Sequence, residues 1–254
     1  MHTFVIAEIG SAWTYSTSSA LEAVYTAKQC GSDAIKYQWT SDPREMERRR
    51  NVASGTYDIL HYPIGLIKDI RAECQRQGIE FMCSVYLPKD VDSMNPYVKR
   101  WKVASLENQA NDLVLAMEAT GKPLIISHGA TGQRDDAWGK MHSVLHCTAA
   151  YPADISSLNL LAIRSLELGY AGYSDHSSNV LTGAIAVACG ARIVEVHFKL
   201  NDTPQENPDY KHSLTPYELR EYIANIRQAE RMLGDGRKKI EPCEEWALKH
   251  KVKV

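Results

Sequence analysis

The chain of 254 residues is 44% hydrophobic and 24% charged, with 29 Lys plus Arg against 31 Asp plus Glu. This balance gives no net field that would favour a nucleic acid or a membrane surface as partner, and the apolar share can bury a sizeable core. The six cysteines are scattered, and neither a signal peptide nor a membrane-spanning run is visible. We therefore expect a cytoplasmic protein.

Strand-like and helix-like runs alternate along the chain. We expect strands at 3–9, 34–38, 79–84, 100–104, 123–127, 143–147, 170–174 and 192–197. Helices are expected at 18–29, 57–77 with an interruption at Pro63, 88–94, 110–120, 135–140, 156–168, 181–189 and 215–233, and a polar loop at 39–56. Eight such units in this length favour an α/β fold, a (β/α)8 TIM barrel that forms a single domain over residues 1–254.

Two histidines occupy matching positions at the ends of consecutive expected strands. His176 follows one strand and His197 ends the next. Because two parallel strands joined by one helix can lie side by side, we expect the imidazoles to converge, as a catalytic divalent metal requires. Asp175, Glu195 and Asp209 are close enough in sequence to assist as ligands or acid-base groups. The alternative is a loop histidine and an unrelated core histidine.

Other polar residues also fall where expected strands end, the face that carries the active site in such barrels. Lys36 and Lys102 stand out, because a lysine within an apolar strand is costly unless it meets an anion. With nearby serines they predict a pocket for a phosphate or a carboxylate, although snorkelling to the rim is an alternative. Glu8 and Glu107 are candidate acid-base groups or, alternatively, rim charges. The arginines at 48–50 are expected to be solvated.

Eight ordered motifs resemble the N-acetylneuraminate (sialic acid) synthase family, over nearly the whole chain. They read IAEIG at 6–10, IKYQ at 35–38, KVASLEN at 102–108, KPLIIS at 122–127, LHCT at 145–148 with YP at 151–152, GYSDH at 172–176, GARIVEVHF at 190–198, and PD at 208–209 with SL at 213–214. The resemblance implies a metal-dependent condensation of phosphoenolpyruvate with an open-chain sugar aldehyde, which releases phosphate.

The same resemblance implies roles for particular residues. His176 and His197 would hold Mn²⁺ or Mg²⁺, which would act as a Lewis acid on the aldehyde oxygen. Proton transfer and activation of water would fall to Glu8 and Glu107. Phosphoenolpyruvate would be bound by Lys36, Ser84, Lys102, Ser105 and Ser127. The substrate site would also include Gln38, Asn51, Tyr151, Ser174 and Asp209, most of them facing the sugar.

The chain departs from the family pattern on the side expected to hold the sugar. Ala12 and Trp13 replace an Asn-His pair, Ala149 replaces an Asn, and the sequence stops at Val254, before the family's small antifreeze-like C-terminal domain. Ala149 lacks the amide, and Trp13 offers a flat apolar surface for stacking. We therefore expect an acceptor other than N-acetylmannosamine.

Two other classes of function remain open at this point. One is a metal-dependent barrel hydrolase or lyase that uses His176, His197 and an aspartate, and the other is a non-catalytic binding protein derived from a synthase. The lysine pair favours the synthase over both. We expect small-molecule substrates, namely phosphoenolpyruvate and an aldehyde, and neither nucleic acid nor membrane. We also expect a homo-oligomer, in which a partner chain could replace the missing domain.

Overall fold

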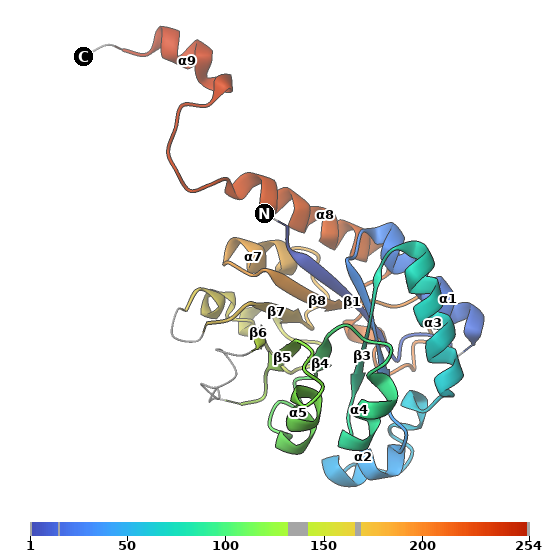
Figure 1. Cartoon of the computed structure of the whole chain (residues 1–254). Helices are drawn as coiled ribbons and strands as arrows, with labels where there is room; N and C mark the ends of the chain where they lie inside the picture. Colours follow the sequence, from blue (N-terminus) through green and yellow to red (C-terminus); the bar gives the residue numbers. More distant parts are fainter. Residues whose placement is uncertain (1, 15, 132–141, 166–168, 253–254) are drawn as a thin grey trace.

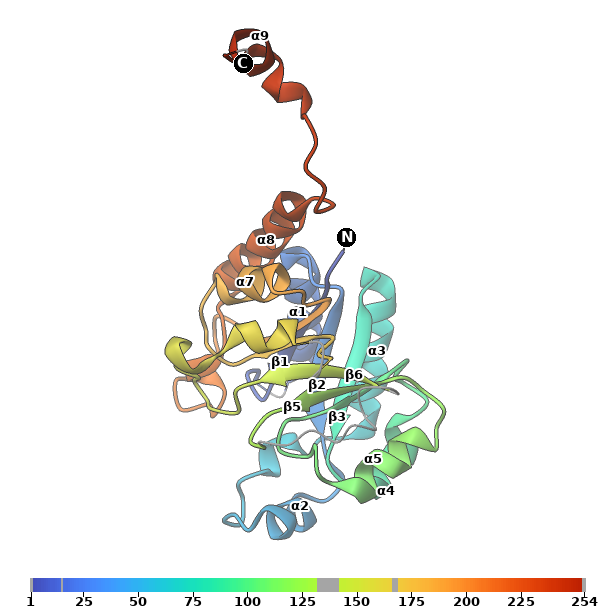
Figure 2. The same ribbon diagram turned by 90° about the vertical axis from the view of Figure 1, so that its left-hand side faces the viewer.

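The computed structural model describes residues 2–14, 16–131, 142–165 and 169–252 (Figure 1). Eight parallel strands form a nearly closed barrel with helices on its outside (Figures 1 and 2). The strands are β1 Phe4–Gly10, β2 Ala34–Trp39, β3 Glu80–Val85, β4 Trp101–Val103, β5 Leu124–His128, β6 Ser143–Cys147, β7 Gly172–Asp175 and β8 Ile193–His197. The expected (β/α)8 barrel is confirmed.

The hydrogen-bonded order of the strands is β3-β2-β1-β8-β7-β6-β5-β4. Its two ends, β3 and β4, meet through a side chain, because the Ser84 hydroxyl donates to the Lys102 carbonyl oxygen at 3.0 Å. The barrel is thus completed by one of the residues that the sequence placed in the substrate site.

Helices alternate with the strands. They are α1 Thr17–Cys30, α2 Pro43–Arg50, α3 Ile64–Gln77, α4 Pro88–Met94, α5 Asn111–Glu118, α7 Thr182–Ala188, α8 Pro216–Leu233 and α9 Glu245–His250. Short 3-10 turns are η1 Asp58–Leu60, η2 Ile155–Ser157, η3 Leu160–Arg164, η4 Tyr210–His212 and η5 Pro242–Glu244. In Figures 1 and 2 the segment after α8 runs away from the barrel to α9. Within the described ranges, no helix has both the length and the apolar character needed to cross a membrane.

Two expectations about local structure are wrong. The expected loop at 39–56 contains α2, which begins where the Asp42 carboxylate accepts from the Glu45 amide at 2.9 Å and Pro43 occupies the first turn. In place of a helix at 156–168, the described part forms η2 and η3. The interruption at Pro63 is confirmed, because α3 starts directly after it. The helix expected at 135–140 lies outside the described residues.

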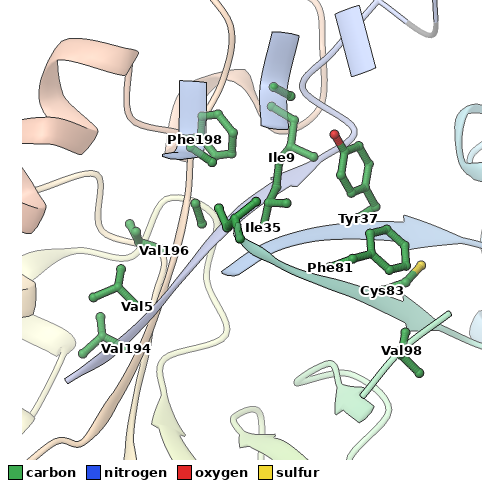
Figure 3. Packing of buried hydrophobic residues seen from close by; sticks show 14 of the residues in the cluster. Val5, Ile9, Ile35, Tyr37, Phe81, Cys83, Val98, Val194, Val196 and Phe198 are labelled. Atoms are coloured by element: carbon green, nitrogen blue, oxygen red, sulfur yellow. The ribbon is translucent and has the colours of Figure 1, made fainter. Parts of the chain in front are cut away.

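Alternate side chains of each strand serve two different layers. One set packs outward against the helices and forms the main core, part of which Figure 3 shows around Val5, Ile35 and Val196. The other set points into the barrel and starts with a small apolar cluster at the N-terminal ends of the strands. That cluster comprises Ile6, Ala34, Met82, Ile125 and Leu145. Two residues further along the strands, the inward positions become charged or polar, which places the chemistry at the C-terminal mouth.

Candidate active site

The strand register brings three sequence-predicted residues side by side at this mouth. Glu8 of β1 is in register with Lys36 of β2 on one side and with His197 of β8 on the other. Ser174 of β7 is in register with Glu195 of β8. Because neighbouring strands are less than about 5 Å apart, these side chains share one small volume.

The two buried lysines form a network with two carboxylates. Lys36 Nζ lies 2.7 Å from Glu8 Oε2 and 3.3 Å from Glu195 Oε2. Lys102 Nζ lies 3.4 Å from Glu195 Oε1 and donates to the Ser127 hydroxyl at 2.7 Å. Glu195 therefore links the lysines, and both ammonium groups face the mouth and are not at the rim.

Burial and charge act against each other in this network. Burial disfavours the Lys36 ammonium, but Glu195 and Glu8 outweigh it and raise the pKa of Lys36. Burial also disfavours the Glu8 carboxylate, but Lys36 and His197 hold its pKa well below the ordinary range. For Lys102, burial prevails over the attraction of Glu195, and its pKa is lowered. Glu8 and Lys36 are thus a charged pair, whereas Lys102 releases its proton more readily than an ordinary lysine.

Beside this network, the turn after β8 adds two residues next to His197. One ligand atom from each of His197, Asp209 and His212 can be chosen so that all lie within 4.8 Å of one another. The rings of His197 and His212 are 4.7 Å apart between centroids, and those of His176 and His197 are 5.4 Å apart. The predicted convergence of two histidines is therefore present, and a third imidazole accompanies it.

Asp209 is held by the turn that follows β1. Its Oδ2 accepts from the Ser11 amide at 2.7 Å and from the Ser11 hydroxyl at 2.8 Å. Burial works against its charge, but the His212 and His197 imidazoles and the Ser11 amide lower the pKa of Asp209 to about 2. The carboxylate is therefore ionised at neutral pH and faces the histidines.

His176 is oriented by its backbone neighbour. Its Nδ1 lies 3.0 Å from the Thr148 carbonyl oxygen, an acceptor only, so Nδ1 carries the hydrogen and Nε2 keeps its lone pair. The Tyr151 ring stacks on it with centroids 4.2 Å apart. Burial and the neighbouring His197 lower the pKa of His176 to about 3, so the ring stays neutral at neutral pH.

These residues fit a divalent metal. Neutral imidazoles and an ionised carboxylate are its usual protein ligands, and among the described residues the buried Nδ1 atoms of His197 and His212 have no hydrogen-bond partner. A buried polar nitrogen without a partner is costly unless a ligand satisfies it. His176 and His197 are the residues that would hold the ion, with Asp209 beside them.

The network and the histidines line one cavity of about 270 Å³. Its lining includes eleven residues that the sequence predicted, namely Glu8, Lys36, Gln38, Lys102, Ser105, Ser127, Tyr151, Ser174, His176, His197 and Asp209. Gln38 donates to the Glu8 carboxylate, and the Ser105 and Tyr151 hydroxyls are 3.0 Å apart. Residues from seven strands or the turns that follow them thus meet in one hollow.

Three predicted site residues lie outside this lining. Ser84 is buried beneath it and bonds to Lys36 Nζ at 3.2 Å. Glu107 lies behind the cavity wall, where its carboxylate accepts a hydrogen bond from Arg50, a residue of the lining. Asn51 is exposed and lines a separate hollow with Arg44 and Arg48, so the structure does not bring it to the cavity.

The expectation that Trp13 faces the sugar is wrong. Trp13 is 1% exposed and packs edge-on against Tyr37 and Tyr62 at 5.9 and 5.2 Å between ring centroids, in the outer core. Ala12 is fully buried as well. These two departures from the family pattern therefore change the packing behind β1 and not the cavity wall.

Arg50 is a cavity residue that the sequence analysis missed. It was expected on a solvated loop face, but it projects from α2 into the lining, bonds to the Glu107 carboxylate and donates to the Tyr57 hydroxyl at 2.7 Å. Its guanidinium lies 5.0 Å from the Tyr57 ring centroid and 5.2 Å from that of Tyr86. Arg48, two residues earlier, is exposed.

Glu107 depends on this arginine. Burial raises the pKa of Glu107, and Arg50 opposes the shift. A buried carboxyl group with a raised pKa holds a proton more readily than an ordinary glutamate, which suits it to proton transfer beside a cavity.

A barrel with buried lysines and a metal-type histidine cluster at its C-terminal mouth is an enzyme scaffold for an anionic substrate. The sequence profile of the NeuB family matches residues 23–238. The chain belongs to the NeuB family, and its resemblance to sialic acid synthases and its assignment to the condensing synthases are thereby confirmed.

Individual relatives agree with this. The N,N'-diacetyllegionaminic acid synthase of Legionella pneumophila is 31% identical, over 94% of this chain and 75% of its own length. The pseudaminic acid synthase of Campylobacter jejuni is 30% identical, over 98% of this chain and 79% of its own length. Among solved structures, the spore coat polysaccharide biosynthesis protein SpsE of Bacillus subtilis has a TM-score of 0.81 at 26% identity, covering 95% of this chain and 72% of its own.

Proposed function

We propose that this chain catalyses a metal-dependent condensation of phosphoenolpyruvate with a sugar aldehyde. The observation that carries the proposal is the pair of buried lysines, Lys36 and Lys102, joined by Glu195 directly beside the histidine cluster. A hydrolase or lyase that uses only the metal needs no such pair. A binding protein would have no use for an ionised carboxylate, Glu8, beside a lysine with a lowered pKa, Lys102, in one cavity.

The reaction balances with the groups present. The methylene carbon of the enol forms a bond to the aldehyde carbon, the aldehyde oxygen takes a proton, water adds to the enol carbon, and phosphate leaves with its C–O electron pair. Lys36 and Lys102 would bind the phosphate and carboxylate, with Ser84, Ser105, Ser127 and Ser174 supporting them. Glu8 and Glu107 would move protons, and Gln38, Tyr151 and Asp209 would contact the sugar.

When bound, a divalent ion such as Mn²⁺ or Mg²⁺ would supply Lewis-acid polarisation of the aldehyde oxygen. His176 and His197 would hold it. His176 is suited to this because its Nδ1 is already engaged by Thr148.

We infer that the acceptor is an aldehyde other than N-acetylmannosamine. The 30–31% identical relatives named above are synthases of legionaminic and pseudaminic acids, not of N-acetylneuraminate. Ala149 presents only a methyl group, and Arg50 and His212 add polar character to the cavity. We expect that a sugar aldehyde with additional polar or charged substituents fits this lining better.

We further infer that residues 1–254 act as one catalytic unit, in a homo-oligomer. The six cysteines are free thiols in the described chain, which supports a reducing, cytoplasmic location.

The test is phosphate release by the purified chain, with phosphoenolpyruvate and Mn²⁺, against a panel of aldoses and N-acylated amino sugars. Release that requires both phosphoenolpyruvate and an aldehyde supports the synthase. Release from phosphoenolpyruvate alone would identify a hydrolase, and no release with any aldehyde would favour the binding protein. A better specificity constant for N-acetylmannosamine than for every other aldehyde would contradict the acceptor inference.

A further inference from the structure

His212 is nearly inaccessible, yet its polar atoms are unsatisfied. It is 3% exposed, and within the described chain neither of its ring nitrogens makes a hydrogen bond. Its Nε2 faces Asp209 Oδ1 at 3.3 Å, close but not hydrogen-bonded. A buried imidazole whose Nδ1 has no partner and whose Nε2 has only this ion-pair contact is costly in a protein interior, so its position calls for a ligand.

The neighbours of His212 show where that ligand would lie. The ring is 4.7 Å from the ring of His197 and 5.1 Å from that of Tyr151, which also stacks on His176. The imidazole is therefore directed into the cavity shared with the other two histidines, and His197 has an unsatisfied Nδ1 of its own. One ligand atom from each of His197, His212 and the ionised Asp209 can be chosen so that all three lie within 4.8 Å of one another.

We propose that His212 is a third imidazole ligand of the metal, and that it shifts the site's preference towards ions such as Zn²⁺, Co²⁺ or Fe²⁺ over Mg²⁺. The inference rests on the metal site of the proposed function and goes beyond the two-histidine site that the sequence predicts. Imidazole is a good ligand for zinc and iron, whereas magnesium prefers carboxylate, carbonyl and water oxygens. Each added imidazole therefore favours the transition ions.

The loop that carries His212 is built to hold it in place. The turn begins after β8 and is fastened at Asp209 by Ser11, and it is closed where Phe198 pairs with Leu214. His212 ends the 3-10 turn η4 between these two anchors. A rigid support of this kind keeps a ligand in position before the ion arrives.

The test compares the metal-free protein with His212→Ala and His212→Phe, the second of which keeps the ring and removes both nitrogens. Co²⁺ binding is followed by visible absorption, and Zn²⁺ and Mg²⁺ affinities are measured by competition. We expect both variants to lose the ligand-field spectrum of the unaltered protein and to lower the Zn²⁺-to-Mg²⁺ affinity ratio by at least about tenfold. His2→Ala, an exposed histidine before β1, is the matched control and should change neither.

An unchanged Co²⁺ spectrum and an unchanged affinity ratio in a folded His212→Phe protein would overturn the proposal. Phosphate release is measured separately. If the spectrum depends on His212 but no aldehyde supports phosphate release, the metal ligand stands and the proposed reaction is wrong. If phosphate is released and the spectrum does not depend on His212, the reaction stands and the third ligand is wrong.

Discussion

Gly10 faces Asp209 so closely that a β-carbon at position 10 would lie 2.4 Å from Asp209 Oδ2. The same glycine has φ +51°, in the left-handed region. Position 10 is therefore restricted twice, by space and by backbone conformation. The end of β1 and the metal-side carboxylate fit together only because this residue has no side chain.

We expect Gly10→Ala to destabilise the protein by about 1–3 kcal/mol and to displace the Asp209 carboxylate. Denaturant unfolding measures the first effect and metal affinity the second. Gly65→Ala is the control, since a β-carbon there meets no atom within 4 Å and the position lies in α3. Equal stability of the two variants would contradict the close fit.

Removal of a cavity lysine should weaken anion binding. We expect Lys36→Met and Lys102→Met each to reduce phosphoenolpyruvate affinity by about two to three orders of magnitude, measured by calorimetry. Lys36→Met should also lower stability by about 3–5 kcal/mol, because it leaves Glu8 without its 2.7 Å partner. Lys68→Met, on the exposed side of α3, should change neither quantity. Unaltered affinity in both cavity variants would show that the anion binds elsewhere.

Asp175 predicts a pH dependence of stability. Burial raises its pKa from 3.8 to about 6, against the hydrogen bonds that it accepts from Ser177 and Tyr222. The folded protein then keeps a proton that the unfolded chain releases between pH 3.8 and 6, so the free energy of unfolding falls as pH rises through this window.

Asp175→Asn has no carboxyl group to titrate, so it removes this fall in the free energy of unfolding with rising pH. Relative to the unaltered chain, its free energy of unfolding should rise by about 2.4 kcal/mol between pH 4 and pH 7. Urea unfolding at a series of pH values measures the difference. Asp202→Asn, an exposed site, is the control, and a difference that stays constant with pH would refute the shift.

Arg50 should control the protonation of Glu107. In Arg50→Met the opposing guanidinium is gone, so the pKa of Glu107 should rise further and a larger fraction of Glu107 should be protonated at a given pH. We expect phosphate release at pH 7 to fall by about a hundredfold and the acid limb of the pH–rate profile to move to higher pH. Arg48→Met, exposed on the same helix, should leave the profile in place. A lower rate with an unmoved profile would mean that Arg50 contacts substrate only.

The strand-end residues could be predicted from sequence because their position along the chain fixes their position in space. In a parallel barrel, a residue at the C-terminal end of a strand must lie at the mouth, and so the positions of Lys36, Lys102 and His197 in the cavity lining could be predicted. The order of the eight motifs along the chain then indicated the sialic acid synthase family.

The residues that were missed lie on segments whose paths depend on tertiary contacts. The helix that carries Arg50 is almost entirely polar and buries only Met46 and Glu47, so no apolar period marked it. His212 lies well past β8 and returns to the mouth only because its turn is tied to Ser11 through Asp209. Trp13 was misplaced for the same reason, because its neighbours Tyr37 and Tyr62 come from distant parts of the sequence.

The carboxylates beside Lys36 and Lys102 affect how a cation and an anionic substrate bind at the mouth of the barrel. Even with both lysines charged, the carboxylates of Glu8 and Glu195 balance them, and the ionised Asp209 adds a negative charge in the same cavity. A phosphorylated carboxylate would bring at least two further negative charges into this interior, a transfer that is costly without compensation. Divalent cation and phosphoenolpyruvate should therefore raise each other's affinity by the same factor, as thermodynamic linkage requires. With His176 and His197 as the residues that would hold the cation, the aldehyde would meet a site in which the charge of phosphoenolpyruvate is balanced.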